Sequence, residues 1–250
     1  MPSAESETPH GAVAALVVAT APDAVHDTAP QAPDLLWRTV AGRPLFVWPL
    51  WALAQLEDVD FLALVVPPER QGEAAHIVGR APLRGRVDAV LPSAGDDAIW
   101  RHALAALEGL AADCEWILAL DATMPLVTSD AIHAGLRAAG RTGVAIAAEP
   151  VKETLKRLDG ASVAETLPRD ALRRLLPLVI FRREALDRAL AATSTGATKG
   201  ATDLIALAQL AGVPLTTFDA GYPAVRVTSE DDLAIVETLL RQRPLEARPS

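Results

Sequence analysis

The stretch from Glu115 to Pro125, E-W-I-L-A-L-D-A-T-M-P, constrains the fold of this chain more than any other. Residues 116–120 are a continuous apolar run that stops abruptly at Asp121. A run without alternation is typical of a strand buried on both faces of a parallel sheet. Ligands of open α/β sheets bind beyond the carboxyl ends of the strands, where Asp121 would stand. Asp121 therefore either holds a divalent cation on a nucleotide's phosphates or caps the following turn.

Apolar runs and amphipathic segments alternate along most of the chain. The runs predict strands at residues 12–19, 61–66, 86–91, 116–120, 144–148, 214–219 and 224–227. The amphipathic segments predict helices at residues 69–79, 96–112, 129–140, 182–193, 202–210 and 229–241. Such alternation indicates one α/β unit, with a mostly parallel sheet and helices on both of its faces.

Local signals refine several of these elements. Gly42 and Pro44 precede a helical pattern with Leu45, Leu53 and Leu56 on its apolar face, and Pro49 inside the pattern predicts a kink or a late start. In the helix predicted at 96–112, Ile99, Ala103, Leu107 and Leu110 are expected inside. Gly140 is expected to end the helix that starts at Ser129. Ser229 and Asp232 have the spacing of a capping box.

The remaining segments are two terminal tails, a long loop and an arm. Residues 1–11 and 243–250 are expected to be tails, the first of them disordered, around a domain at 12–242. Residues 20–36 form a long Ala/Pro/Asp segment without periodicity, which is typical of a functional or mobile loop. From Glu149 the chain is charged and poorly amphipathic, which predicts an arm at about 150–180 outside the main sheet.

Composition excludes several classes of protein. The 250 residues carry a net charge of −9, which argues against nucleic acid and anionic membranes as main partners. The chain begins with acidic and polar residues, unlike a secretory signal, and no apolar run is long enough to span a bilayer. Cys114 is the single cysteine, so no internal disulfide can form, and we expect it to be a small core or helix-end residue. A cytoplasmic location follows.

Five motifs occur in an order that resembles a known family. They are G-R-P-L-F-V-W at 42–48, L-D-A-T-M-P at 120–125, E-T-L-K-R-L-D at 153–159, A-T-D at 201–203 and V-R-V-T-S-E-D-D-L-A-I-V-E at 225–237. Together they resemble the 2-C-methyl-D-erythritol 4-phosphate cytidylyltransferases. The resemblance implies a three-layer nucleotidyltransferase fold with a protruding arm. It also implies transfer of a cytidylyl group from CTP to a sugar-alcohol phosphate, with Mg²⁺ as cofactor and pyrophosphate as by-product, in isoprenoid-precursor synthesis.

The resemblance also implies roles for individual residues. Asp121 matches the family's metal-binding Asp, and Arg226 stands where the family has a Lys near the phosphates. Arg157 is implied to reach the acceptor's phosphate across a homodimer interface, so Arg226 and Arg157 are the predicted catalytic cations. The other residues implied to bind the acceptor are Thr154 and Lys156 on the arm, and Thr202 and Asp203 in a later loop.

The chain departs from the family pattern after its first strand. The family has A-A-G-x-G-x-R-M followed by P-K-Q, whereas this chain has A-T-A-P-D-A-V-H-D followed by P-D-L-L-W. Glycine there lets backbone N–H groups approach phosphates closely. Asp23 and Asp27 would instead repel a triphosphate. Met124 occupies the place of an Arg and is expected to fill a gap in the core.

These departures leave three hypotheses open. The chain is a divergent cytidylyltransferase, or a catalytically impaired homologue with a binding or regulatory role, or a nucleotidyltransferase for another nucleotide or acceptor. Release of pyrophosphate from CTP distinguishes the active cytidylyltransferase from the catalytically impaired homologue. The impaired homologue should be slow, because the loss of one electrostatic donor typically costs roughly 10²–10³ in rate.

Overall fold

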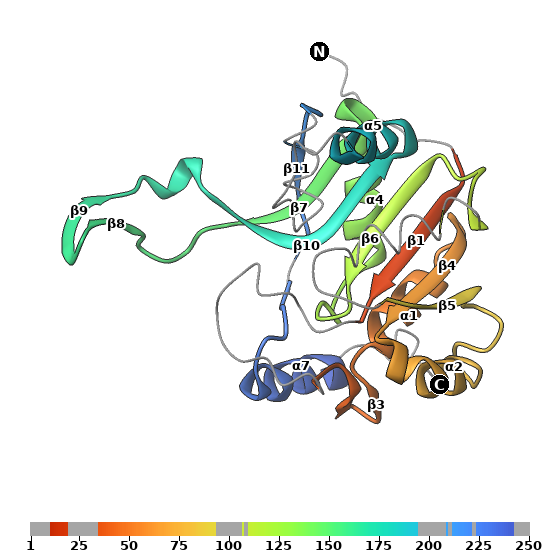
Figure 1. Ribbon diagram of the computed structural model, residues 1–250. Coiled ribbons are helices and arrows are strands. Elements are labelled where there is room, and N and C mark those ends of the chain that lie inside the picture. Colours follow the sequence, from red (N-terminus) through yellow and green to blue (C-terminus); the bar gives the residue numbers. More distant parts are fainter. Residues whose placement is uncertain are drawn as a thin grey trace, which may run out of the picture.

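The protein folds around a seven-stranded, mostly parallel sheet of order β11-β7-β10-β6-β1-β4-β5 (Figure 1). The computed structural model describes residues 11–19, 35–93, 107, 110–194, 209, 212–221 and 224–242. The strands of this sheet are β1 (Val13–Val18), β4 (Val59–Val66), β5 (Ala89–Pro92), β6 (Trp116–Asp121), β7 (Val144–Pro150), β10 (Arg173–Arg182) and β11 (Thr216–Asp219). β10 runs antiparallel to both of its neighbours, β6 and β7. The predicted mostly parallel sheet with helices on both faces is confirmed, but β10 was not among the predicted strands. Most of its residues were assigned to the arm, because its first three residues, Arg173–Leu175, are exposed and continue the charged pattern of the arm.

The central strands are buried on both faces, which explains their unbroken apolar sequences. In β1, Ala15 and Val17 face one core cluster, whereas Ala14 and Leu16 face the other. β6 lies parallel to β1 and is buried from Trp116 to Leu120. Burial of both faces removes the need for alternating polar residues, so the sequence pattern follows from the position of these strands in the middle of the sheet.

Helices cover both faces of the sheet. The α-helices within the described residues are α1 (Val47–Ala54), α2 (Gln71–Val78), α4 (Ser129–Thr142), α5 (Arg183–Ser194) and α7 (Glu230–Gln242). The short 3₁₀ helices are η2 (Leu35–Trp37), η3 (Pro68–Arg70) and η4 (Arg169–Ala171). Buried side chains of α1, α2, α4 and α7 belong to one core cluster, and those of α5 belong to the other together with Leu107 and Cys114. Cys114 is therefore a core residue, as expected.

Several local predictions need correction. α1 begins at Val47, which is the late start predicted from Pro49, and Pro49 lies in its first turn. Leu45 and Leu56 were expected on the apolar face of this helix, but both lie outside it. Gly42, at φ +88°, makes the turn between the short strands β2 (Thr39–Val40) and β3 (Arg43–Pro44), rather than a helix start.

Two helix predictions and one strand prediction were also wrong in part. α4 continues past Gly140 and ends at Gly143, because Gly143 adopts the left-handed conformation (φ +88°) that closes the helix. Leu110 is 52% exposed, whereas Leu107 is buried. Residues 224–227 are not a strand, although the Val227 N–H donates to the Thr123 carbonyl oxygen. Nearly all of the helix predicted at 202–210 and most of that at 96–112 lie outside the described residues.

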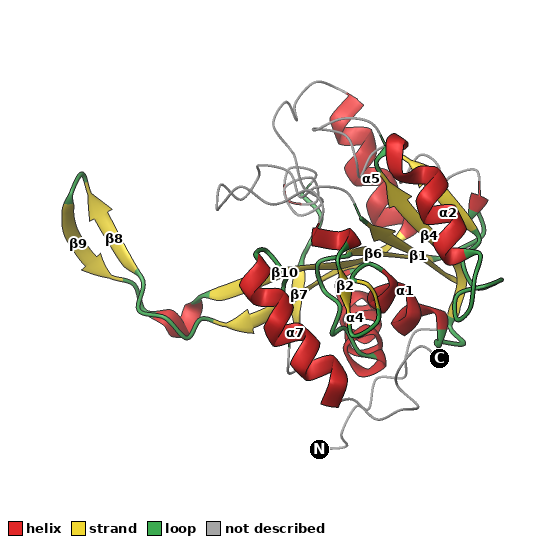
Figure 2. Cartoon of the chain, turned by 90° about the horizontal axis from the view of Figure 1, so that it is seen from below, coloured by secondary structure: helices red, strands yellow, loops and turns green. Residues whose placement is uncertain are grey.

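The predicted arm is present and projects far from the body (Figure 1 and Figure 2). β7 and the first half of β10 lead into it, and a hairpin of β8 (Lys156–Asp159) and β9 (Ser162–Thr166) forms its tip. All residues of this hairpin are exposed in a single copy. No helix in the described part of the chain is both long and apolar enough to cross a bilayer.

Candidate active site

Asp121 ends β6 at the carboxyl edge of the sheet. It is the β-partner of Val18, the last residue of β1, so the two central strands end side by side. In an open α/β sheet this edge is where ligands bind. The segment that follows β1, residues 20–34, lies outside the described residues.

The Asp121 carboxylate is held in a partly buried position. The Thr123 backbone N–H donates to its Oδ1 at 2.8 Å. Its Oδ2 lies 3.9 Å from Nη2 of Arg226, and 15% of the Asp121 side chain is exposed. Burial raises the pKa of Asp121, and the Thr123 N–H and the Arg226 guanidinium offset the rise only in part. A cation placed beside Oδ2 would stabilise the charged carboxylate.

Arg226 approaches Asp121 from a distant part of the sequence. The segment that carries it, residues 224–229, has no regular secondary structure and precedes α7. The Val227 N–H donates to the Thr123 carbonyl oxygen at 2.8 Å, which places the neighbouring Arg226 beside β6. Nε of Arg226 is buried and has no hydrogen-bond partner within the described part of the chain. A buried N–H group without a partner is costly, so this guanidinium is suited to an anionic ligand.

The residues around Asp121 otherwise belong to the core. Ala122 and Met124 are 0% and 2% exposed and lie in the same core cluster as Leu120. Met124 therefore fills core space, as the sequence predicted, and offers no charge to a phosphate. Thr123 was not predicted as part of the site; its backbone contacts both Asp121 and the Arg226 segment. Sequence carries no signal for such a contact, because any residue has the same backbone groups.

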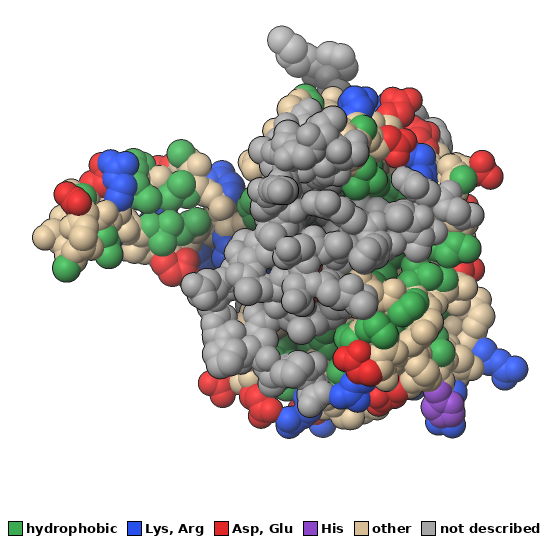
Figure 3. All heavy atoms as spheres, in the orientation of Figure 1, with side chains coloured by type: hydrophobic (Ala, Val, Ile, Leu, Met, Phe, Trp, Pro, Cys, Tyr) green, Lys and Arg blue, Asp and Glu red, His purple; other side chains and the backbone are tan. Residues whose placement is uncertain are grey.

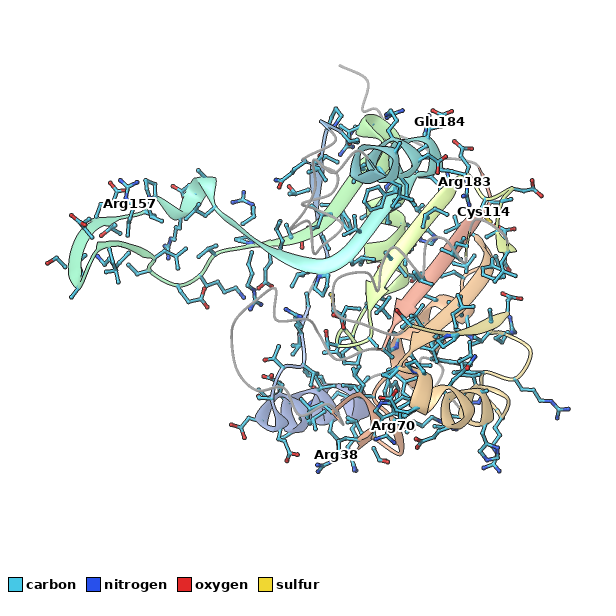
Figure 4. All side chains as sticks on the ribbon, viewed as in Figure 1. Arg38, Arg70, Cys114, Arg157, Arg183 and Glu184 are labelled. Atoms are coloured by element: carbon cyan, nitrogen blue, oxygen red, sulfur yellow. The ribbon has the colours of Figure 1, made fainter. Side chains whose placement is uncertain are left out.

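The arm residues lie far from Asp121 within one copy, as the position of Arg157 in Figure 4 shows. Arg157 forms an ion pair with Glu165 across the hairpin at 2.8 Å, and Lys156 donates to the Thr166 hydroxyl. Thr154 is exposed just before β8. A single copy of the chain therefore brings Asp121 and Arg226 together but leaves the predicted acceptor-binding residues of the arm elsewhere.

Another cation on the arm was not singled out from the sequence. Arg169, in η4, lies closer to the body along the chain than the hairpin does and donates to the carbonyl oxygen of Lys152 at 3.3 Å. Its guanidinium lies next to the segment that carries Thr154, whereas Arg157 is already paired with Glu165. The sequence signal that could have indicated Arg169 was its position between β9 and β10, the two strands that flank η4. Thr202 and Asp203 lie outside the described residues.

The described residues contain no cluster of three or more acidic, His or Cys side chains able to hold a metal on their own. Mg²⁺ needs no such cluster, because it is commonly held by one or two carboxylates and the phosphates of its substrate. Asp121 meets this requirement: Oδ1 accepts one hydrogen bond, and Oδ2 faces Arg226 beyond hydrogen-bond distance. The residues present therefore fit a phosphate-bound cation at Asp121.

Comparison with known proteins identifies the family. The model of the 2-C-methyl-D-erythritol 4-phosphate cytidylyltransferase family matches residues 13–242, which include the whole sheet, the arm and α7. The chain belongs to this family. It is a divergent, cytidylyltransferase-like member, in which the motifs of Asp121 and Arg226 meet at one edge of the sheet.

Curated relatives and solved structures agree with this assignment. The chain is 30% identical over 212 residues to the 2-C-methyl-D-erythritol 4-phosphate cytidylyltransferase of Dehalococcoides mccartyi, covering 84% of this chain and 89% of the relative. It is 32% identical over 204 residues to that of Cereibacter sphaeroides, with 82% and 87% covered.

The fold is shared with crystal structures from the same family. The 4-diphosphocytidyl-2C-methyl-D-erythritol synthase of Anaerococcus prevotii superposes with a TM-score of 0.73 at 18% identity, over 92% of this chain and 99% of that one. The cytidylyltransferase of Thermus thermophilus gives 0.66 at 24% identity, over 90% and 98%. The three-layer nucleotidyltransferase fold is therefore confirmed.

Proposed function

We propose that this protein transfers a cytidylyl group from CTP to 2-C-methyl-D-erythritol 4-phosphate and releases pyrophosphate. The observation that carries the proposal is the pairing of Asp121 with Arg226 at the carboxyl ends of the central strands. The relatives described above are named as cytidylyltransferases or synthases, which favours catalysis over a binding or regulatory role.

The chemistry asks the protein mainly for positioning and for neutralisation of charge. Arg226 would donate its unpartnered Nε–H to a phosphate oxygen of the nucleotide. Mg²⁺, when bound, would neutralise negative charge on the triphosphate, and Asp121 would hold it. The low exposure of Asp121 and Arg226, 15% and 22% of their side chains, limits competing water and strengthens both interactions.

The proposal includes a homodimer formed through the arm. A two-stranded hairpin alone is marginally stable in water, so β8 and β9 need a further surface to pack on. Leu158 and Val163 are register partners in this hairpin and are 59% and 62% exposed. Apolar side chains are visible along the arm in Figure 3. A second copy would cover them and bring the arm to the partner's sheet edge.

In this arrangement the arm of one protomer would supply acceptor-binding residues to the other. Thr154, Lys156 and Arg157 are assigned to the acceptor by resemblance to the family, as are Thr202 and Asp203 of the same chain. Arg157 would have to exchange its ion pair with Glu165 for the acceptor's phosphate, and both side chains are exposed enough to do so. A cytosolic location is also part of the proposal, supported by a single cysteine that has no disulfide partner in the sequence.

Pyrophosphate release from CTP, Mg²⁺ and 2-C-methyl-D-erythritol 4-phosphate tests the proposal. Asp121→Ala should reduce turnover by roughly 10²–10³, because it removes the group that positions the cation. Asp113→Ala is the matched control: Asp113 is exposed in the turn before β6, at the opposite end of the strand, and its loss should leave turnover unchanged. Turnover that survives Asp121→Ala, or absence of turnover with CTP, contradicts the proposal. Activity with ATP, GTP or UTP instead would point to another nucleotide.

A further inference from the structure

The segment that carries Arg226 is anchored at two points rather than by regular structure. On one side, the Val227 N–H donates to the Thr123 carbonyl oxygen next to Asp121. On the other side, Thr228 and Ser229 bind the side chain of Asp232, in the first turn of α7. The backbone of Arg226 lies just before these anchors, so they decide where its guanidinium can reach.

Asp232 makes more contacts than a helix cap requires. Its Oδ2 accepts hydrogen bonds from the N–H groups of Thr228 and Ser229, at 2.8 and 2.9 Å. It also accepts bonds from the hydroxyls of both residues, at 3.0 Å each. Ser229 Oγ accepts the Asp232 N–H at 3.4 Å, which completes the predicted capping box. The two hydrogen bonds from Thr228 are not part of the capping box. They hold Thr228, which precedes the helix, against the first turn of α7.

The pKa of Asp232 agrees with this description. Partial burial alone would raise it, but the hydrogen bonds from Thr228 and Ser229 outweigh burial and lower the pKa. The carboxylate is thus charged at neutral pH, and its Oδ2 accepts all four of these bonds. Charge-assisted hydrogen bonds of this kind are roughly twice as strong as neutral ones, so the anchor is firm.

Packing and hydrogen bonds hold α7 in place, and with it Asp232 in its first turn. Val236 and Leu240 are 0% exposed and pack in the core cluster that also contains Leu120 and Val227. At its start, Glu230 pairs with Arg38 at 2.7 Å, and Figure 4 shows Arg38 beside this helix. Further along, Glu237 accepts the Ala41 N–H at 3.3 Å. The helix is therefore attached both to the sheet and to the β2–β3 turn.

We propose that Asp232 is a positioning residue that sets the place of Arg226 beside Asp121. This inference rests on the proposed function, in which Arg226 binds a phosphate. Asp232 acts on Arg226 through the backbone: it holds Thr228 and Ser229 while Thr123 holds Val227, so the three residues that directly follow Arg226 are fixed. Ordering the segment before substrate arrives lowers the entropic cost of binding it in the reactive geometry.

Asp232→Asn tests the inference, since it keeps the size of the side chain but removes the charge that collects four hydrogen bonds. We expect kcat/KM for CTP to fall by on the order of 10- to 100-fold, because small displacements of positioning groups have such effects. Ser229→Ala is the control for helix capping: it removes the bonds of Ser229 Oγ but keeps the Ser229 N–H and both bonds of Thr228 on Asp232. It should lower the melting temperature while kcat/KM at 25 °C is retained. Asp231→Asn, an exposed carboxylate in the same turn, should change neither.

A double-mutant cycle separates positioning from general damage. If Asp232 acts through Arg226, then Asp232→Asn should have little further effect on turnover in an Arg226→Met background. Equal losses in both backgrounds would overturn the inference. So would an Asp232→Asn enzyme that keeps wild-type kcat/KM.

A second readout does not depend on activity. The ¹⁵N NMR signal of Arg226 Nε–H, assigned by its loss in Arg226→Met, should be sharp in the wild type and in Ser229→Ala. In Asp232→Asn it should shift or broaden through exchange between side-chain positions. An unchanged signal refutes the positioning role. A changed signal in a protein that releases no pyrophosphate from CTP would uphold the positioning and refute the proposed function.

Discussion

Gly135 provides a sharp test of the packing that holds the sheet and its helices together. It lies in the middle of α4, on the face turned toward β10 and β11. A Cβ added there would stand 2.6 Å from Ile180 Cδ1 and 2.7 Å from Phe218 Cζ. Real Cβ atoms essentially never come this close to other carbons, so Gly135→Ala must displace α4 or both side chains.

The magnitude follows from two opposing effects. Alanine in place of glycine favours a helix by up to about 1 kcal/mol. Overpacking a well-packed core costs about 1–3 kcal/mol, and Ile180 and Phe218 have little room to move, being 0% and 7% exposed. We therefore expect a net loss of up to about 2 kcal/mol. For a chain of this size, about 2 kcal/mol lowers the melting temperature by roughly 4–8 °C.

Thermal unfolding followed by circular dichroism measures the effect. Gly72→Ala is the matched control, because Gly72 lies in α2 with no heavy atom of the described residues within 4 Å of its would-be Cβ, and its replacement should raise the melting temperature. Ile180→Val removes the nearest clashing atom, so it should cost less in the Gly135→Ala background than in the wild type. A Gly135→Ala protein that is stabilised as much as Gly72→Ala would show that the α4–sheet contact is looser than described.

Two further predictions concern pH and the arm. Because the folded pKa of Asp232 is lowered, its stabilising contribution is complete above the ordinary Asp pKa of about 3.9 and is lost as pH falls through the folded value. The stability difference between wild type and Asp232→Asn in urea should therefore shrink in acid, and a difference independent of pH would contradict the lowered pKa. If the arm forms the proposed homodimer, the wild type should sediment as a dimer, Leu158→Glu combined with Val163→Glu should sediment as a monomer, and Asp159→Asn, also in the hairpin, should remain dimeric. A dimer that survives the double substitution would place the interface elsewhere.

The sequence could predict most of the sheet, and the edge at which the candidate site lies, because burial on both faces leaves a strong local pattern. The apolar run 116–120 and its stop at Asp121 are visible without any tertiary information, and β6 has these limits within one residue. The capping box of Ser229 and Asp232 was also predictable, because both partners lie within one helical turn and their spacing is diagnostic.

Errors arose where backbone geometry, rather than residue type, decides the structure. Gly140 and Gly143 are chemically identical, and the termination of α4 at the second depends on which one reaches the left-handed conformation as the chain enters β7. Likewise, Gly42 and Pro44 are compatible with a helix start or a hairpin. Contacts with α7 at Ala41 accompany the hairpin in the folded chain.

What the sequence determined by itself was therefore most of the buried strands, though not β10, together with the order of the family's motifs and the chemical types of the candidate site residues. Only the tertiary structure decided that Asp121 and Arg226 meet, that Thr123 joins them through its backbone, and that the arm carries Arg157 away from both. The physical reason is the separation along the sequence of the residues that interact. Burial and capping act on neighbouring residues and mark the sequence, whereas the approach of two distant segments depends on how the sheet and α7 pack.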